Sequence, residues 1–287
     1  MFFSLQVVEL IKKRYSCRTY LNKPIEEDKK DILKSYLSSV KTAVFNTNLR
    51  FGLITATEED RNALKGLGTY GFIKDPPGFI VGAAEDSKYS LEDYGYAMEK
   101  IILFSTDIGF GTCWLGGTFN KSNFAAKISK NDDEIVPAVA SIGYKKEKRS
   151  TMESIIRWTA GSDNRLSWDK MFFNIDFETP MIKEDIGEYA IAIEMVRLAP
   201  SASNKQPWRI VKDKNIFHFY LQRTKGYERN QKLFKTVDLQ RIDMGIAMCH
   251  FELSAKEMNL EGKWEIITPQ RTNQLRDNEY LVSWIGH

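Results

Sequence analysis

Apolar residues at helical spacing mark the first long element of the chain. Residues 25–40, "IEEDKKDILKSYLSSV", place apolar positions among charged ones with a period of about 3.6 residues. This pattern predicts an amphipathic helix, and the acidic residues at its start suit the positive end of a helix dipole. The predicted apolar face consists of Ile32, Leu33, Tyr36, Leu37 and Val40.

Other apolar stretches predict further helices and short strands. Runs rich in β-branched and aromatic residues predict strands, and the two runs beginning at 208 and 216 are close enough to pair. Because helices and strands mix without strict alternation, the pattern favours an α+β fold over a doubly wound sheet. The predicted helices are 91–109, 183–199 and 240–258, and the predicted strands are 49–56, 78–84, 137–144, 208–212, 216–222, 264–268 and 279–286.

The chain resembles itself at a fixed spacing. Residues 93–114, "DYGYAMEKIILFSTDIGFGTCW", align without a gap to residues 243–264, "DMGIAMCHFELSAKEMNLEGKW", at an offset of 150. Downstream, "AVASIGY" at 138–144 resembles "LVSWIGH" at 281–287 at an offset of 143, so the second copy lacks seven residues between helix and strand. Two ordered blocks of this kind predict an internal duplication.

The duplication sets the expected domain organisation. We expect a first half at 1–165 and a second half at 166–287, packed as one compact unit. The bridge between them is expected at 145–178, and its aromatic residues suggest that it packs against the body of the protein. These aromatic residues are Trp158, Trp168, Phe172 and Phe173.

Composition narrows the class of protein. The 41 basic and 38 acidic residues leave a formal charge of +3, too small to argue for nucleic acid or an anionic membrane as partner. Three cysteines without a CxxC motif, Cys17, Cys113 and Cys249, predict reduced thiols rather than a disulfide framework. No apolar run approaches the ~20 residues of a membrane span, and the N-terminus lacks the features of a signal peptide. We therefore expect a cytoplasmic protein.

Two short segments carry candidate chemistry. In "RYSCRTY", Arg14, Ser16 and Arg18 alternate after a helical pattern, and two guanidinium groups with a hydroxyl suit a phosphate. The same residues also fit a solvated basic helix end. In "APSASNKQPW", residues 199–208, short polar side chains lie between two prolines. This segment could present main-chain N–H groups to a ligand, or it could simply end a helix and enter an edge strand.

Taken together, four segments resemble the nitroreductase family of FMN-dependent oxidoreductases. They are "RYSCRTYLNKPI", "GFGTCWLGG", "IVPAVASIGYKKEKRSTMESII" and "APSASNKQPWRIV". In that family the PSxxNxQPW element precedes the GLGTCW-like one, whereas here it lies in the second half. Its first-half counterpart, "VKTAVFNTNLRFGLI", lacks the prolines, serines and Trp, and Tyr15 replaces a common second Arg. The order resembles the branch in which two family subunits are fused into one chain.

The resemblance implies an α+β nitroreductase-like fold, a pseudo-dimer within one chain, and one FMN. In the family, one subunit supplies the RxSxR element, the loop after the GLGTCW-like strand and a basic residue beyond the GY strand, while its partner supplies PSxxN. The first half has the former set and the second half the latter, and the sequence ends at His287, where a second copy of the basic residue would follow. The implied cofactor-binding residues are Arg14, Ser16, Arg18, Gly116, Gly117, Lys148, Arg149, Ser201, Ser203 and Asn204.

Roles follow from the motif positions. Arg14 and Arg149, with Lys148, would hold the phosphate together with Ser16. Arg18 would reach the pyrimidine edge of the flavin and tune it. Gly116 and Gly117 would let main chain approach the ring, and the PSxxN residues would contact the cofactor from the second half. The three histidines, His218, His250 and His287, have no metal-ligand spacing, so no metal is expected.

The implied activity is FMN-dependent oxidation of NADH or NADPH, with ping-pong hydride transfer to a nitroaromatic, a quinone or a similar flat acceptor. No protein nucleophile or base is needed, because the flavin carries the hydride. We expect a small-molecule acceptor and a monomeric chain, with no nucleic-acid or membrane partner and with further dimerisation left open. Two alternatives remain: a flavin-binding protein without turnover, and a flavin-free scaffold.

Overall fold

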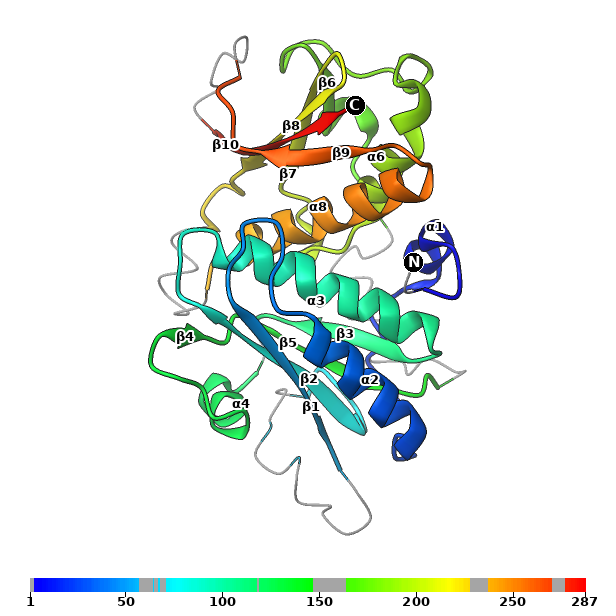
Figure 1. The fold of residues 1–287 in the computed structure, drawn as a ribbon, viewed down its shortest axis with the longest axis vertical. Helices are drawn as coiled ribbons and strands as arrows, with labels where there is room; N and C mark the ends of the chain where they lie inside the picture. The colour runs from blue at the N-terminus through cyan, green and yellow to red at the C-terminus, as the bar shows by residue number, and fades with distance from the viewer. Residues whose placement is uncertain are drawn as a thin grey trace. The chain divides into compact units, whose positions relative to one another are not determined.

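The computed structural model divides the chain into two units, Met1–Thr159 and Ala160–His287, which we call the N-terminal and C-terminal units and describe separately (Figure 1). In the described part of the chain, no helix combines the length and apolar character needed to cross a membrane. The structure describes residues 3–56, 64, 67, 71–117, 119–146, 164–227, 237–269 and 277–287.

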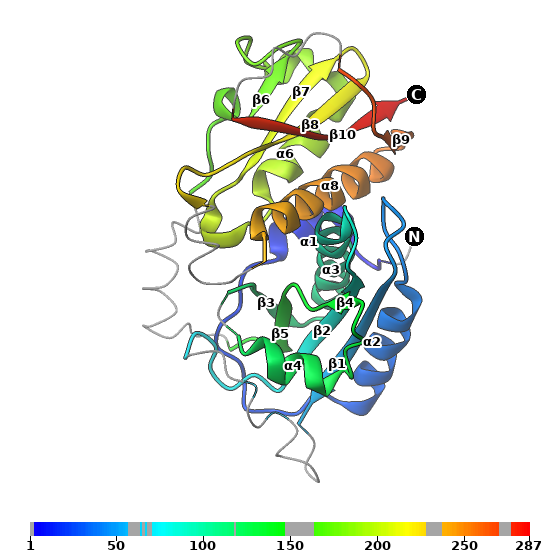
Figure 2. The ribbon, with the colours of Figure 1, turned by 90° about the vertical axis from the view of Figure 1, so that its left-hand side faces the viewer.

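The N-terminal unit is an antiparallel sheet with helices on both faces. Its strands follow the order β1-β2-β5-β3, and the short β4 also pairs with β2. Figure 2 shows α2 and α4 on opposite sides of this sheet. The elements are α1 (Val7–Lys13), α2 (Glu27–Ser39), β1 (Leu49–Thr55), β2 (Gly78–Glu85), α3 (Ser90–Asp107), β3 (Gly111–Leu115), α4 (Lys121–Lys127), β4 (Glu134–Ile135) and β5 (Val139–Gly143).

The C-terminal unit has a five-stranded sheet in the order β6-β7-β8-β10-β9. Strand β6 runs parallel to β7, and the other neighbours are antiparallel. Four 3₁₀ turns lie before or between its longer elements in the described residues: Trp168–Lys170, Lys183–Asp185, Gly187–Tyr189 and Ala202–Asn204. The remaining elements are β6 (Phe172–Asn174), α6 (Ala190–Leu198), β7 (Trp208–Asp213), β8 (Ile216–Gln222), α8 (Leu239–Glu257), β9 (Gly262–Glu265) and β10 (Asn278–Gly286).

The two units repeat one topology. The strand order β1-β2-β5-β3 corresponds to β7-β8-β10-β9, and a long buried helix, α3 or α8, follows the second strand in each unit. The loops that lead into β1 and β7, residues 40–48 and 199–207, have equal lengths. The α+β class is therefore confirmed, and the layout is the one that a duplicated chain requires.

Aromatic side chains build the core of the C-terminal unit. Phe217 and Phe219 alternate on β8, so both point to the same face of the sheet. There they meet Phe251 of α8, with ring centroids 5.2 and 5.4 Å apart. Trp264 and Trp284 complete the cluster from β9 and β10, 5.3 Å from each other. Edge-to-face contacts of this kind stabilise a core beyond the area that they bury.

Three sequence expectations are wrong in detail. Ile32 is 49% exposed, because the buried face of α2 is centred on Leu33 and Leu37, with the aliphatic stem of Lys30 beside them. The helix predicted at 183–199 contains only α6, because Gly187 has a positive φ of 66° and the preceding residues form 3₁₀ turns. The strand predicted at 264–268 ends at Glu265.

A buried histidine on the opposite face of the C-terminal sheet makes stability depend on pH. His218 of β8 lies opposite Ser283 of β10, with 2.7 Å between its Nδ1 and the Ser283 Oγ. Burial lowers the pKa of His218 below its usual 6.5, although Asp213 opposes this shift. Because the folded pKa lies below the unfolded one, the contribution of His218 to stability is constant above pH 6.5 and falls as the pH drops below that value.

As the pH falls below 6.5, we expect His218 to lower the free energy of unfolding of the wild-type protein by up to about 1.4 kcal/mol per pH unit. The His218→Gln variant should lack this part of the pH dependence in urea unfolding between pH 7.5 and 5.5, and His287→Gln, at an exposed position, is the control. Equal pH profiles for wild type and His218→Gln would contradict the assignment.

Candidate functional site

The RxSxR segment lies along the outer strand of the N-terminal sheet. It follows α1 directly, and Ser16 forms a parallel bridge to Thr112 of β3. The N–H of Cys17 donates to the carbonyl of Thr112 over 2.8 Å. The segment therefore extends the sheet beyond β3 and holds its side chains in a fixed order.

Arg14 is anchored by a buried acid. Its Nε lies 3.5 Å from Oε1 of Glu99 on α3, and the two side chains are 7% and 0% exposed. The other carboxylate oxygen, Oε2, accepts a hydrogen bond from the indole N–H of Trp114 over 2.7 Å. Glu99 thus ties the segment to both α3 and β3, which fixes the position of the guanidinium.

Lys145 joins this site, although the sequence did not single it out. Its ammonium nitrogen lies 5.2 Å from the ring centroid of Tyr15. Burial lowers the pKa of Lys145; the thiol of Cys17 opposes this effect, and the charges of Lys13 and Arg14 add to it. A half-buried cation beside other cations attracts an anion. The sequence signal for Lys145 is its position directly after "GY", at the start of the basic run whose later residues, Lys148 and Arg149, the family resemblance assigns to the phosphate.

Gly111 lets these segments converge. A Cβ on Gly111 would lie 2.8 Å from Cγ of Lys145 and 2.9 Å from Cβ and Sγ of Cys17. Any larger residue there would push the lysine and the RxSxR segment off the end of β3. The second glycine of "GFGTCW", Gly111, thus allows the close approach of β3, the RxSxR segment and Lys145. It does not form a phosphate-binding turn.

Arg18 has a guanidinium nitrogen that is available to donate a hydrogen bond. Its NH1 is buried and has no hydrogen-bond partner in the described residues. Buried donors of this kind are rare in folded proteins, and a bound acceptor is one common reason for them. We call Arg14 and Lys145, whose charges interact, the cation cluster.

The remaining predicted residues of this unit lie nearby in the chain or outside the described part. Gly116 and Gly117 follow β3 directly, the first half-buried and the second exposed. Lys148, Arg149 and Trp158 lie outside the described residues. In the part of the chain that the structure describes, no group of three or more His, Cys, Asp or Glu side chains could hold a metal ion.

In the C-terminal unit, the "APSASNKQPW" loop connects α6 to β7. Its main chain has positive φ values at Ser203, Asn204 and Gln206. The hydroxyl of Ser201 accepts from the N–H of Gln206 over 2.9 Å, and Asp243 of α8 accepts from the N–H of Ala202 over 2.9 Å. These bonds hold an unusual main-chain path in place.

The amide of Asn204 is also used inside this unit. Its Oδ1 accepts from Arg165 over 3.0 Å, and its Nδ2 donates to the carbonyl of Asn164 over 2.7 Å. Ser203 and Lys205 are the exposed residues of the loop. Ser201 and Asn204 therefore shape the loop, and Ser203 presents a hydroxyl at its surface.

The equivalent loop of the N-terminal unit is held differently. Asp93, the counterpart of Asp243 on α3, accepts from the N–H groups of Phe45 and Thr47 over 2.8 and 2.9 Å. Asp243 receives only one such bond, and its Oδ2 has no partner in the described residues. The two loops share a length and an anchor but differ in where their N–H groups point.

Fold and site together define an α+β protein of two related units, with a cationic site beside the sheet of the first. A family model described as "Putative TM nitroreductase" matches residues 6–255, so the chain belongs to this nitroreductase family. A putative nitroreductase from Thermotoga maritima MSB8 is similar over 98% of this chain and 94% of its own, at 22% identity and a TM-score of 0.62. This likeness confirms the nitroreductase-like fold.

Smaller proteins align with only part of the chain. A nitroreductase family protein from Clostridium difficile 630 covers 52% of this chain and 90% of its own, at 22% identity and a TM-score of 0.41. A nitroreductase with bound FMN from Bacteroides fragilis NCTC 9343 covers 52% of this chain and 95% of its own, at 22% identity and a TM-score of 0.38. No curated protein matches the chain.

Proposed function

We propose that the chain is an FMN-dependent oxidoreductase that uses NADH or NADPH to reduce nitroaromatic, quinone or similar flat acceptors. The observation that carries the proposal is the cation cluster, in which Lys145 lies beside Arg14 of the RxSxR segment. Membership of a nitroreductase family supports the same reaction class. We place the activity in the site rather than in the fold, since one fold serves many reactions.

The residues present fit FMN. Arg14, Lys145 and the hydroxyl of Ser16 would hold the phosphate, because guanidinium and ammonium groups make charge-assisted hydrogen bonds to its oxygens. The orphaned NH1 of Arg18 would donate to the pyrimidine edge of the ring system and stabilise negative charge there. When bound, FMN supplies hydride transfer between the nicotinamide and the acceptor.

The other residues would complete the site. Gly116 and Gly117 would let the main chain after β3 approach the flavin closely, as residues without a Cβ can. Lys148 and Arg149 would add cations at the phosphate. From the C-terminal unit, Ser203 would present its hydroxyl, while Ser201 and Asn204 would keep the loop in its left-handed conformation.

We further propose one FMN per chain and a monomer that does the work of a family dimer. The RxSxR segment has no counterpart in the second half, and the PSxxN segment has none in the first. Each half thus supplies what the other lacks. The proposed partner is a small-molecule acceptor, without nucleic acid or membrane, in the cytoplasm.

The test is the visible absorption spectrum of the purified chain after incubation with FMN and desalting, recorded before and after NADH or NADPH is added under nitrogen. We expect about one flavin per chain, bleached by the nicotinamide and reoxidised by a quinone. Flavin that binds but stays oxidised would favour a binding protein without turnover. Two flavins per chain would refute the composite site, and none would refute the proposed function.

A further inference from the structure

The outer edge of β1 presents main-chain groups that no strand of the described residues uses. β1 is the last strand of its sheet in the part of the chain that the structure describes. The bonds from Ala56 N–H to the carbonyl of Pro77 and from Glu85 N–H to the carbonyl of Asn48 show that even-numbered residues face β2. By the alternation of an antiparallel ladder, Phe51 and Leu53 direct their N–H and C=O groups outward.

The corresponding edge of the C-terminal unit is occupied by β6. Because the two loops before β1 and β7 have equal lengths, Ile210 and Lys212 occupy the positions of Phe51 and Leu53. The N–H of Ile210 donates to the carbonyl of Met171 over 2.9 Å, and the carbonyl of Lys212 accepts from the N–H of Ile175 over 2.7 Å. The N–H and C=O groups that bind β6 in the C-terminal unit therefore have counterparts at Phe51 and Leu53 on the outer edge of β1.

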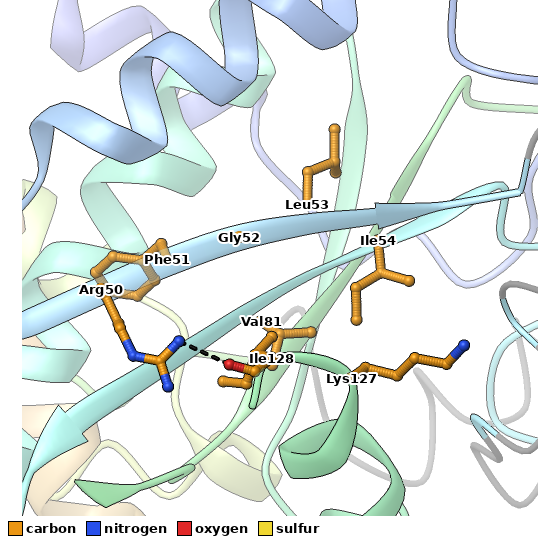
Figure 3. Close-up of a pocket in the computed structure, with 8 residues that line it drawn as sticks. All are labelled: Arg50, Phe51, Gly52, Leu53, Ile54, Val81, Lys127 and Ile128. Carbon is orange, nitrogen blue, oxygen red and sulfur yellow. Dashed lines mark hydrogen bonds between the residues drawn. The ribbon is translucent and has the colours of Figure 1, made fainter. Parts of the chain in front are cut away.

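A cavity of about 260 Å³ opens beside this edge on the side of α4. Gly52 takes the place of Val211, and a Cβ on Gly52 would meet nothing within 4 Å. The missing side chain leaves room between β1 and the end of α4 for a group from outside, since a cavity of roughly 150 Å³ already holds benzene. Figure 3 shows the lining residues: Arg50, Phe51, Gly52, Leu53, Ile54, Val81, Lys127 and Ile128.

Two cationic side chains line the cavity, and they differ in whether they are already paired. Arg50 is engaged with both carboxylate oxygens of Glu134, at 2.7 and 2.6 Å, and with the carbonyl of Ile128 at 2.8 Å. Lys127 is exposed at the rim near Ile54 (Figure 3). One available cation at the end of the cavity favours an acidic group at the C-terminal side of a strand that runs parallel to β1.

We propose that the edge of β1 binds an extended segment of a partner polypeptide as an added parallel strand. The occupant carries a large apolar side chain, best an aromatic one, opposite Gly52, and an acidic residue a few positions later. In β6, Phe173 lies opposite Val211, the counterpart of Gly52, and Asp176 follows three residues later. Main-chain bonds supply affinity and the cavity supplies selectivity, as in other strand-addition complexes.

The probe is a fluorescent peptide with the sequence of residues 170–178, "KMFFNIDFE", titrated with the full-length protein and followed by anisotropy. Saturable binding is expected for wild type. Gly52→Trp, which fills the open space with an indole, should weaken binding at least tenfold, whereas Ile32→Trp, at an exposed position of α2, should not change it. Thermal unfolding of both variants checks that they fold.

A pair of methylated peptides tests the direction of the strand. Methylation of the Ile175 nitrogen removes the donor to Leu53 and should weaken binding about tenfold, as expected for one lost hydrogen bond. Methylation of the Asn174 nitrogen, whose counterpart in β6 points away from β7 to Thr179, should have little effect. Flavin content plays no part in either readout.

Three outcomes would overturn the proposal. They are the absence of saturable binding, binding that survives in Gly52→Trp, and equal effects of the two methyl groups. Concentration-dependent dimerisation that Gly52→Trp abolishes, without peptide binding, would assign the edge to a second copy of the chain instead.

Discussion

In a Glu99→Gln background, Arg14→Met is expected to weaken FMN binding by about 30-fold and to leave riboflavin binding unchanged. Hydrogen bonds to charged groups contribute roughly 1.5–3 kcal/mol, and about 1.4 kcal/mol corresponds to a tenfold change in Kd. Riboflavin lacks the phosphate, so only the FMN titration should respond. Quenching of flavin fluorescence measures both constants.

The background removes a complication. Arg14 pairs with a fully buried carboxylate, and breaking such a buried ion pair from one side costs about 3–5 kcal/mol of stability. Glu99→Gln keeps an acceptor for the indole of Trp114, so it serves as the reference. Arg18→Met should weaken FMN and riboflavin alike, because its orphaned nitrogen is assigned to the ring. If the Arg14 variant bound FMN and riboflavin more weakly by the same factor, the assignment of Arg14 to the phosphate would be wrong.

Asp93→Ala is expected to lower the free energy of unfolding by about 3 kcal/mol. The substitution leaves the N–H groups of Phe45 and Thr47 without their acceptors, and each unsatisfied donor in a buried setting costs roughly 1–3 kcal/mol. Urea unfolding measures the loss. Hydrogen exchange of the peptide that covers residues 40–48 should quicken with it, which locates the effect in the loop before β1.

Asp243→Ala is the matched variant in the second unit, and it should lower the free energy of unfolding by about 1 kcal/mol or less. It removes one hydrogen bond, but it also removes a buried carboxyl whose second oxygen is unpaired. Burial raises the pKa of Asp243 well above its usual 3.8. The wild type should therefore gain stability as the pH falls through that raised pKa, and Asp243→Ala should lack this gain. A larger loss for Asp243→Ala than for Asp93→Ala would contradict this account of the two loops.

The sequence was most informative where burial constrains every position. The offset of 150 lies in the helices α3 and α8, whose residues are mostly buried, which explains identities such as Asp93 and Asp243. The paired strands β7 and β8 were also predictable, because short apolar runs flank a tight connection. The RxSxR and PSxxN segments stood out because their composition does not suit a core.

Other features required contacts between distant parts of the chain. Lys145 looked like one of several lysines in a solvated run, and only its approach to Tyr15 and Gly111 distinguishes it. The pairing of Arg14 with Glu99 joins residues 85 positions apart, which no local pattern reveals. The roles of Ser201 and Asn204 in shaping their loop depend on positive φ values and on Arg165.

By itself, the sequence determined the α+β class and the two motifs and predicted the duplication, because each of these depends on residues that are close in the chain or repeated along it. The tertiary structure decided how each motif is used. It placed Lys145 beside Arg14 and gave β7 a neighbouring strand. Among the described residues, it left NH1 of Arg18 without a partner and the outer edge of β1 without a strand. Packing and hydrogen bonding between distant segments set these features, and their energies depend on neighbours that the local sequence does not specify.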